Sequence, residues 1–315
     1  MLPRQRPSNY KILSRDQVSI SDLTNDDVII VVMGPTGAGK SNFIHTLAEN
    51  ETAVGHGLAS YTSGVSAYRL KCSDGIDIVL VDTPGFNDTH LSDRRILEVT
   101  AKWVKEVGKR DLQVLGFLYL HRISDNRMGS ASRKSLKIFQ KTAGKDFFSR
   151  VTLMTTMWPD PADTVEMEES EVREAELRKE YWAMMIEEGS EVERFTNTRE
   201  SARKIVDRII TAESKRQWSQ IQEELVDQGK DLPATEAGKE LHAAYEDMVA
   251  RQNFLMQQLR AEMEKAAADP VTITALQQQL RDELVKFKNA RKEMRQLESS
   301  GAGGWRCWVC FCQLP

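Results

Sequence analysis

The stretch Gly34–Ser41 reads Gly-Pro-Thr-Gly-Ala-Gly-Lys-Ser and fits the phosphate-loop pattern G-x-x-x-x-G-K-[ST] at every fixed position. It follows an apolar run, Val28–Met33, that predicts a buried strand, and it precedes a predicted helix at Asn42–Glu49. Glycines let the backbone approach a phosphate chain, while amide groups and the helix N-terminus face its negative charge. We expect Lys40 to reach the β- and γ-phosphates of a nucleoside triphosphate and the Ser41 hydroxyl to bind Mg²⁺. The predicted nucleotide contacts are Gly34, Pro35, Thr36, Gly37, Ala38, Gly39, Lys40, Ser41 and Asn42.

A second motif, Asp-Thr-Pro-Gly from Asp82 to Gly85, follows the apolar run Ile78–Val81 and begins 42 residues after Lys40. An aspartate at a strand end holds the Mg²⁺ shell, and the glycine amide senses the γ-phosphate, so this turn moves when that phosphate leaves. ATPases of the AAA or helicase kind more often carry Asp-Glu here, and that glutamate is absent. Together the two motifs predict a phosphate-switch nucleotide domain.

The segment between the two motifs offers hydroxyl groups that could close over the γ-phosphate. Thr62 is the predicted second protein ligand of Mg²⁺, with Thr52 and Ser60 as competitors and an ordinary loop threonine as the alternative. The predicted catalytic group is therefore Lys40, Thr62 and Gly85. The predicted metal ligands are Ser41, Thr62 and Asp82.

Composition excludes several function classes. The chain has 315 residues, 40% hydrophobic and 29% charged, with a formal net charge of −4, which gives no general affinity for nucleic acid. No apolar stretch is long enough to span a membrane, the first ten residues lack a secretory signal, and Leu2 excludes N-myristoylation. Cys72 stands alone and the other cysteines crowd the last nine residues, so a reducing cytoplasm is the expected location.

Four regions are expected along the chain. Residues 1–25 are polar and predict a loose arm, and residues 26–212 alternate strands with helices, which predicts an α/β domain with a mostly parallel sheet. The expected strands are Val28–Met33, Tyr68–Cys72, Ile76–Val81, Val114–Leu120 and Val151–Thr155. The expected helices, besides Asn42–Glu49, are Ser92–Gly108, Ser132–Ala143, Glu166–Glu188 and Glu200–Ala212.

Residues 213–299 are rich in Glu, Gln, Lys, Arg, Ala and Leu, with a heptad-like apolar seam over two helices that break at Asp269-Pro270. This coiled-coil-prone extension could pair with another chain, fold back on itself or pack on the first domain. Residues 300–315 form a glycine linker and a Cys/Trp-rich tail, in which Cys307, Cys310 and Cys312 lack a fourth zinc ligand. S-acylation of these cysteines would hold the chain at a membrane; the alternative is a tail without a role.

The two motifs, with Thr62 and the run Asp82–Thr89, resemble the septin-like and immunity-associated (AIG1-like) GTPases of the translation-factor-related class. Within that group the chain is similar to fungal G-domain proteins, which share the runs Tyr119–Met128 and Thr155–Trp158. The resemblance covers residues 26–212. It implies a Ras-like P-loop fold (a three-layer α/β sandwich), binding of GTP or GDP with Mg²⁺, hydrolysis of GTP to GDP and phosphate, and nucleotide-dependent dimerisation in some relatives.

One departure from that family concerns the base. GTPases read guanine with Asn/Thr-Lys-x-Asp after the fifth strand, and the matching place here reads Thr155-Thr156-Met157-Trp158. Thr155 and Thr156 are retained as predicted contacts, and Asp160 is the predicted replacement for the missing acid. Trp158 either stacks on the base or packs the strand end. Guanine preference therefore follows mainly from the resemblance.

A second departure concerns hydrolysis. Phe86 follows Gly85 where Ras-like enzymes keep a water-orienting glutamine, so we expect slow turnover. His121, Arg122 and Arg127 are candidates to assist at a phosphate, with structural or surface charge as the alternative. The favoured interpretation is a slow GTPase acting as a switch or dimerising module. The competing interpretations are a non-catalytic nucleotide-binding scaffold that works through its helices and, less favoured, an ATP-using kinase.

Overall fold

The computed structural model of the chain describes residues 10–48, 64–211, 217–265 and 270–300. The chain divides into two compact units, Met1–Lys230 and Asp231–Pro315. Thr62, with its competitors Thr52 and Ser60, lies outside the described residues, and so does the tail with Cys307, Cys310 and Cys312. Within the described residues, no helix is long and apolar enough to cross a membrane.

The first unit is built on a seven-stranded sheet with the order β1-β3-β4-β2-β5-β6-β7. Pairs β1–β3 and β3–β4 are antiparallel, and the remaining neighbours are parallel. The strands are β1 (Ile12–Val18), β2 (Val28–Met33), β3 (Ser66–Cys72), β4 (Ile78–Asp82), β5 (Val114–Arg122), β6 (Val151–Thr156) and β7 (Glu191–Arg194).

Helices follow most strands of this unit. They are α1 (Lys40–Ala48), α2 (Asp93–Lys109), α3 (Ser130–Ala143), α4 (Thr164–Glu176), α5 (Ala183–Glu187), α6 (Arg199–Thr211) and α7 (Gln220–Gln222). Short 3-10 turns lie at Ile20–Asp22 and Lys145–Arg150, and π-helical turns at Leu177–Tyr181 and Glu223–Asp227. Side-chain caps fix two of the helix starts: Ser92 accepts the amide of Arg95, and Asp163 accepts the amide of Glu166.

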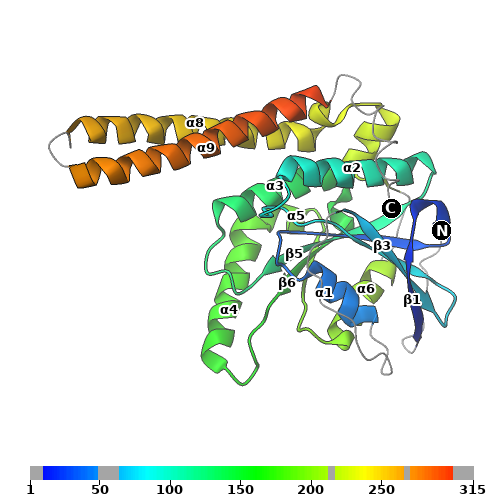
Figure 1. Ribbon diagram of the computed structural model, residues 1–315. Coiled ribbons are helices and arrows are strands. Elements are labelled where there is room, and N and C mark those ends of the chain that lie inside the picture. The colour runs from blue at the N-terminus through cyan, green and yellow to red at the C-terminus, as the bar shows by residue number, and fades with distance from the viewer. Residues whose placement is uncertain (1–9, 49–63, 212–216, 266–269, 301–315) are drawn as a thin grey trace, which may run out of the picture. The chain divides into compact units, whose positions relative to one another are not determined.

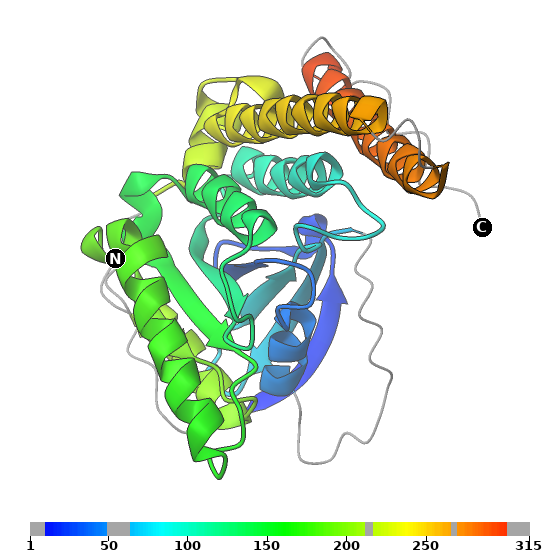
Figure 2. The same cartoon turned by 90° about the vertical axis from the view of Figure 1, so that its left-hand side faces the viewer.

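Helices cover both faces of the sheet, which gives three layers (Figures 1 and 2). Helices α1 and α6 pack on one face, and α2 and α3 lie over the other. Every residue of β2 and of β4 is buried, as a central parallel strand covered on both faces requires. Alternate side chains of β2, Ile30 and Val32, join Phe43 of α1 and Val206 of α6 in one core cluster. The fold class expected from the sequence is confirmed.

Two strands were not expected from the sequence. The prediction of a loose arm over residues 1–25 is wrong for its described part, because β1 pairs with β3 over Ile12–Val18. Strand β7 was also missed. Both lie at the edges of the sheet and carry mostly polar residues, so neither shows the apolar run that marks a central strand. The aromatic ring of Tyr68 helps to hold β1, since the Arg15 guanidinium lies 4.2 Å from its centroid.

The single helix expected over Glu166–Glu188 is interrupted. A π-helical turn at Leu177–Tyr181 separates α4 from α5 and leaves Trp182 between them, completely buried. Such an insertion rotates the residues that follow it around the helix axis. The acidic residues of α4 remain mostly on an exposed face, as expected for a solvated helix.

The boundary between the two units also differs from the expected one at residue 212. Residues 217–230 belong to the first unit. Ile221 and Leu225 are buried, and a Cβ atom at Gly108 of α2 would lie 2.9 Å from Val226. Packing on α2 therefore extends the first unit to Lys230.

The second unit is dominated by two long helices, α8 (Glu236–Lys265) and α9 (Pro270–Ser299), after a 3-10 turn at Leu232–Ala234. They lie side by side along much of their length (Figures 1 and 2), and His242 Nε2 lies 2.9 Å from Glu298 Oε1. Pro270 opens α9, where its missing amide hydrogen costs nothing. Of the arrangements left open, folding back on each other is the one observed; pairing with another chain stays a prediction.

Candidate functional site

The phosphate-loop motif connects the end of β2 to the start of α1, as its spacing predicts. Three of its glycines have positive φ: Gly34 at 144°, Gly37 at 79° and Gly39 at 87°. Residues with a Cβ atom rarely adopt these conformations. The motif therefore forms a turn whose backbone lies open for close approach at the first turn of α1.

Lys40 lies at the centre of this turn and is 7% exposed. Its Nζ donates to the carbonyl oxygens of Gly34, at 3.2 Å, and Pro35, at 2.9 Å. Burial lowers the pKa of Lys40 to about 8, and the charges of Asp82 and Asp88 oppose that shift. An anionic ligand beside this ammonium group would favour its charged form.

The Ser41 hydroxyl donates to Asp82 Oδ2 at 2.6 Å, so the two motifs meet as expected. Asp82 is the last residue of β4, and the next residue fixes its position, because Thr83 Oγ1 donates to the Val32 carbonyl at 2.7 Å. A hydroxyl and a carboxylate are oxygen donors of the kind that Mg²⁺ prefers. No group of three or more Cys, His, Asp or Glu side chains gathers as a metal site within the described ranges. A metal here would therefore need ligands from elsewhere, such as phosphate oxygens.

Thr36 joins the phosphate loop directly to the turn after Asp82. Its amide donates to the Phe86 carbonyl at 2.9 Å, and the Phe86 amide donates to the Gly34 carbonyl at 3.3 Å. Its hydroxyl lies within donating distance of the Gly85 carbonyl, at 2.9 Å, and of Asp88 Oδ2, at 3.0 Å. We call these contacts the Thr36 latch. A Cβ atom at Gly85 would lie 2.5 Å from Thr36 N and 2.6 Å from Lys40 Nζ, so the latch requires glycine there.

A cation lies beside the same loop. Arg122, at the end of β5, has Nη1 3.2 Å from the place where Gly37 would carry a Cβ atom, and its Nη2 lies 3.0 Å from Asp125 Oδ1. Of the three basic candidates named from the sequence, Arg122 is therefore brought to the phosphate loop. The guanidinium group adds positive charge where a phosphate chain would carry negative charge.

The two threonines at the end of β6 point to opposite faces of the sheet. Thr156 Oγ1 donates to the Ala38 carbonyl of the phosphate loop at 2.9 Å. Met157 follows with φ 60°, and its Cε lies 3.7 Å from the place of a Cβ atom at Gly39. Thr156 and Met157 therefore border the phosphate loop, and Met157 was not among the predicted contacts.

The assignment of Thr155 to the nucleotide site is corrected by its contacts. Its hydroxyl lies 3.2 Å from Glu174 Oε1 and 3.0 Å from Trp158 Nε1, on the face of the sheet away from Ala38. Arg194 covers the Trp158 ring at 4.2 Å. Trp158 thus packs the strand end, which is one of the two interpretations that the sequence left open.

The geometry gives Asp160 a different role from the predicted one. Its side chain is exposed, and Oδ1 accepts the amide of Ala162 at 2.9 Å in the turn before α4. Asp160 therefore stabilises its own turn, and no contact joins it to the phosphate loop among the described residues. A carboxylate that reads guanine is not supplied by this residue in the observed conformation.

Asn42, in contrast, reaches the loop after β7. Its Nδ2 donates to Asn197 Oδ1 at 2.7 Å, and Asn197 has φ 59°. This hydrogen bond joins the first turn of α1 to the segment that precedes α6. The loop of Asn197 therefore lies close to the phosphate-loop end of the sheet, together with Met157.

His121 is buried away from this site. Its ring centroid lies 6.2 Å from that of Trp182, and Nδ1 has no hydrogen-bond partner among the described residues. Burial lowers the pKa of His121; Asp125 opposes that shift and Arg122 adds to it. A catalytic role for His121 is therefore not supported by its position.

A pH effect on stability follows from this burial. Below the ordinary pKa of 6.5 the unfolded chain takes up a proton that folded His121 resists, so the free energy of unfolding should fall as the pH decreases. Urea unfolding at pH 7 and pH 5 should show a larger loss of unfolding free energy in the parent chain than in His121→Phe. Equal slopes in the parent and His121→Phe would contradict this expectation.

Comparison with known proteins places these motifs in context. Residues 29–145 match the family model MMR_HSR1, described as a 50S ribosome-binding GTPase. Translation initiation factor IF-2 of Rickettsia rickettsii is 34% identical over 74 residues, which make up 24% of this chain and 8% of that protein. The chain therefore matches only a small part of that relative's length.

Two solved structures are similar to this chain at low sequence identity. Toc33 from Arabidopsis thaliana, in complex with GDP and Mg²⁺, has a TM-score of 0.49 and 17% identity, over 62% of this chain and 88% of that one. A variant of Era from Aquifex aeolicus, bound to GDP·AlF4⁻, has a TM-score of 0.42 and 12% identity, over 61% of this chain and 58% of that one.

Proposed function

We propose that this chain, whose first unit has a Ras-like P-loop fold, binds GTP with Mg²⁺, hydrolyses it slowly and acts as a nucleotide-dependent switch. The observation that carries the proposal is the Thr36 latch, which joins the phosphate loop to the Asp82–Gly85 turn. These two segments are the ones between which the γ-phosphate of a G domain acts. The proposed switch is therefore a conformational change at the place where the phosphate loop meets the Asp82–Gly85 turn.

The described residues fit the nucleotide and its metal. Lys40 and the amides of the glycine turn would hold the phosphates, while Ser41 and Asp82 would hold Mg²⁺, which neutralises charge on the phosphate oxygens. Thr62 stays a proposal as a further ligand. Water would attack the γ-phosphorus while its bond to the β–γ bridging oxygen breaks, so that phosphate and GDP are the products. Lys40 would stabilise the charge on the phosphate oxygens, with Arg122 beside Gly37 as an additional cation.

The latch supports a specific switching step. The Thr36 amide and the Gly85 region are engaged with each other, so a γ-phosphate that recruits the Gly85 amide competes with these hydrogen bonds. Loss of the γ-phosphate lets them form again. Binding of triphosphate and diphosphate should therefore respond differently to a change in the latch.

Replacing Thr36 with alanine tests this step. The variant loses the hydroxyl bonds to Gly85 and Asp88 but keeps the backbone bond to Phe86. We expect the affinity for a GTP analogue, relative to GDP, to rise about three- to tenfold, since one or two hydrogen bonds no longer compete. Titration with fluorescent GDP and a non-hydrolysable GTP analogue measures the ratio. Thr36→Ser keeps the hydroxyl and should retain the parent ratio; a ratio that changes equally in both variants would contradict the latch.

Base preference needs its own experiment, because Asp160, the predicted replacement for the guanine-reading acid, is held in its own turn. The full chain should be titrated with fluorescent GTP, GDP and ATP in the presence of Mg²⁺. Tight binding that is selective for guanine supports the GTP proposal and implicates contacts from the loop that holds Asn197. Equal binding of ATP would overturn guanine selectivity and leave a phosphate-directed nucleotide site.

One observation favours a second candidate function, a nucleotide-binding scaffold without turnover. Phe86 stands where a water-orienting glutamine is usual, and its side chain is 1% exposed, so it fills the core instead of facing a substrate. Multiple-turnover phosphate release with GTP separates the two functions. Turnover by the full chain supports the switch, and binding without turnover supports the scaffold.

Association of two copies, location in the cell and membrane attachment are also proposed. The resemblance to septin-like and immunity-associated GTPases suggests that two copies associate through the G domain or through the helices, when nucleotide is bound. Light scattering of the full chain with GDP and with a GTP analogue tests this association. A cytoplasmic location and membrane attachment through Cys307, Cys310 and Cys312 are likewise proposals.

A further inference from the structure

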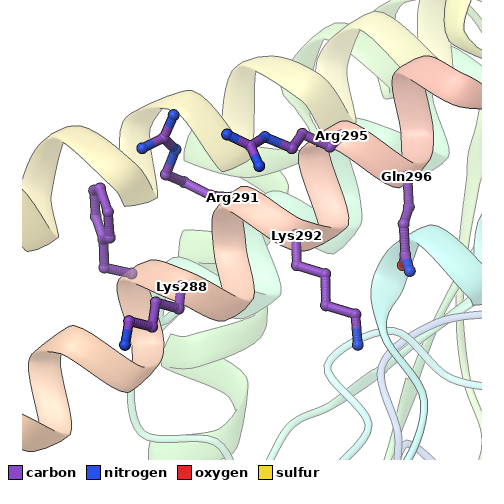
Figure 3. A pocket seen from close by; sticks show the side chains of 6 residues that line it. Lys288, Arg291, Lys292, Arg295 and Gln296 are labelled. Atoms are coloured by element: carbon purple, nitrogen blue, oxygen red, sulfur yellow. The ribbon is translucent and has the colours of Figure 1, made fainter.

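Helix α9 carries a row of cations that the proposed nucleotide chemistry does not use. Lys288, Arg291, Lys292 and Arg295 follow the spacing i, i+3, i+4 and i+7, so they lie on one side of the helix. With Phe287 and Gln296 they line a pocket of about 430 Å³. On that side of the helix, the arginine side chains Arg291 and Arg295 extend along one flank, and the lysine side chains Lys288 and Lys292 extend along the other (Figure 3). We call these four residues the basic face of α9.

The charges of the basic face are not neutralised by the part of the chain that the structure describes. None of the four makes an ion pair there, whereas Lys286 of the same helix lies 2.6 Å from Glu283, and Lys239 of α8 lies 2.8 Å from Glu236. Lys288 and Lys292 are neighbours four residues apart, as are Arg291 and Arg295, and like charges at this spacing repel. An anionic partner would relieve that repulsion.

The surroundings of the basic face indicate which kind of anion it fits. One turn earlier, Leu284 and Val285 expose 38% and 57% of their surface. Directly after α9 the sequence continues into residues 301–315, which include Trp305, Trp308 and Phe311. Cations beside exposed aliphatic side chains, followed by tryptophan, are typical of segments that lie at a membrane–water interface. A nucleic acid would use the cations but would leave Leu284 and Val285 exposed to water.

We propose that the basic face of α9 docks on the surface of a membrane that contains anionic phospholipid. The cations bind the lipid phosphates and carboxylates, and the exposed side chains of Leu284 and Val285 enter the interface. Each cation near an anionic membrane surface raises the affinity for that membrane by a measurable factor. This docking requires no modification of the tail cysteines, so it differs from S-acylation.

Liposome co-sedimentation tests the proposal with the purified, unmodified full chain under reducing conditions. The vesicles are pure phosphatidylcholine or phosphatidylcholine with 30% phosphatidylserine, in about 0.1 M and about 1 M salt. We expect binding to the phosphatidylserine vesicles at the lower salt and its loss at the higher salt, where the Debye length is about 3 Å. Weak binding to the neutral vesicles is expected throughout.

A matched pair of variants separates the basic face from total charge. Lys288→Gln with Lys292→Gln removes two charges from α9, and Arg251→Gln with Arg260→Gln removes two from exposed positions of α8. The α9 pair should weaken vesicle binding by about ten- to thirtyfold, and the α8 pair should change it far less. Glutamine keeps the helix propensity, and circular dichroism checks that both variants fold.

Two results would overturn the proposal. Equal losses in the two pairs would show that total charge governs binding and that the basic face has no special part. Retention of poly(U) RNA by the parent chain, lost in the α9 pair and without any binding to phosphatidylserine vesicles, would assign the basic face to nucleic acid instead.

Discussion

Replacing Lys40 with alanine should lower the affinity of the chain for Mg²⁺·GTP by about a hundredfold or more, because charge-assisted hydrogen bonds to the phosphates are lost. Lys40 is buried, and its Nζ donates to the carbonyls of Gly34 and Pro35. Burial lowers its pKa to about 8, so the ammonium group stands in a place where water does little to satisfy it. In the proposed site a phosphate chain would add negative charge to that of Asp82 and Asp88, so we expect this side chain to contribute strongly to binding.

The measurement is titration with a fluorescent GTP analogue, with two checks. Lys40→Met keeps the aliphatic stem and covers the case in which the alanine variant does not fold. Lys71→Ala removes the same charge from an exposed position of β3 and should bind like the parent chain. If both Lys40 variants fold and bind within about threefold of the parent, the phosphates are held elsewhere and the proposed site is wrong.

The parts of the site that could be predicted are those whose chemistry lies in one short stretch of chain. The phosphate loop needs its glycines, lysine and serine at fixed spacing, so Gly34–Ser41 was placed correctly between β2 and α1. The meeting of Ser41 and Asp82 could also be predicted, since the ends of neighbouring parallel strands share one edge of a sheet. Local pattern and sheet topology together sufficed there.

The base end of the site could not be predicted in the same way. Successive residues of a strand point to opposite faces, so a shift of one residue exchanges the face to which each side chain belongs. Thr155 and Thr156 are the same residue type in adjacent positions, and spacing alone does not tell which one meets the phosphate loop. The hydrogen bond from Thr156 to Ala38 decides it. The hydrogen bond between Asp160 and the Ala162 amide could not be predicted from the position of Asp160 in the sequence either.

The missed elements of the fold have a related cause. Strands β1 and β7 are edge strands whose polar residues carry no apolar signal, and each is defined by its partner: β3 for β1, β6 for β7. The π-helical turn ends beside Trp182, whose ring is completely buried. Such features follow from tertiary packing, which a single sequence does not display.

The second large effect is expected at Gly34, where alanine should destabilise the fold by about 3 kcal/mol or more. Gly34 has φ 144°, and a Cβ atom there would lie 2.5 Å from the Leu120 carbonyl oxygen and 3.2 Å from the Leu120 amide nitrogen of β5. Both obstacles are backbone atoms inside a parallel sheet, which cannot rotate away as a side chain could. Relief would require β2 and β5 to separate at the edge where the phosphate loop begins.

Gly75→Ala is the matched control for this prediction. Gly75 lies between β3 and β4 with φ 78°, and a Cβ atom there would meet nothing within 4 Å, so only the backbone strain of about 1–2 kcal/mol applies. Urea unfolding of the two variants under the same conditions gives the difference in unfolding free energy, which combines the clash with Leu120 and the different backbone conformation of Gly34. If Gly34→Ala lowers the free energy of unfolding no more than Gly75→Ala does, the backbone at the end of β5 can move to accommodate the added Cβ atom. The phosphate loop would then owe its shape to the Thr36 latch and to Lys40 instead of to the rigid edge of the sheet.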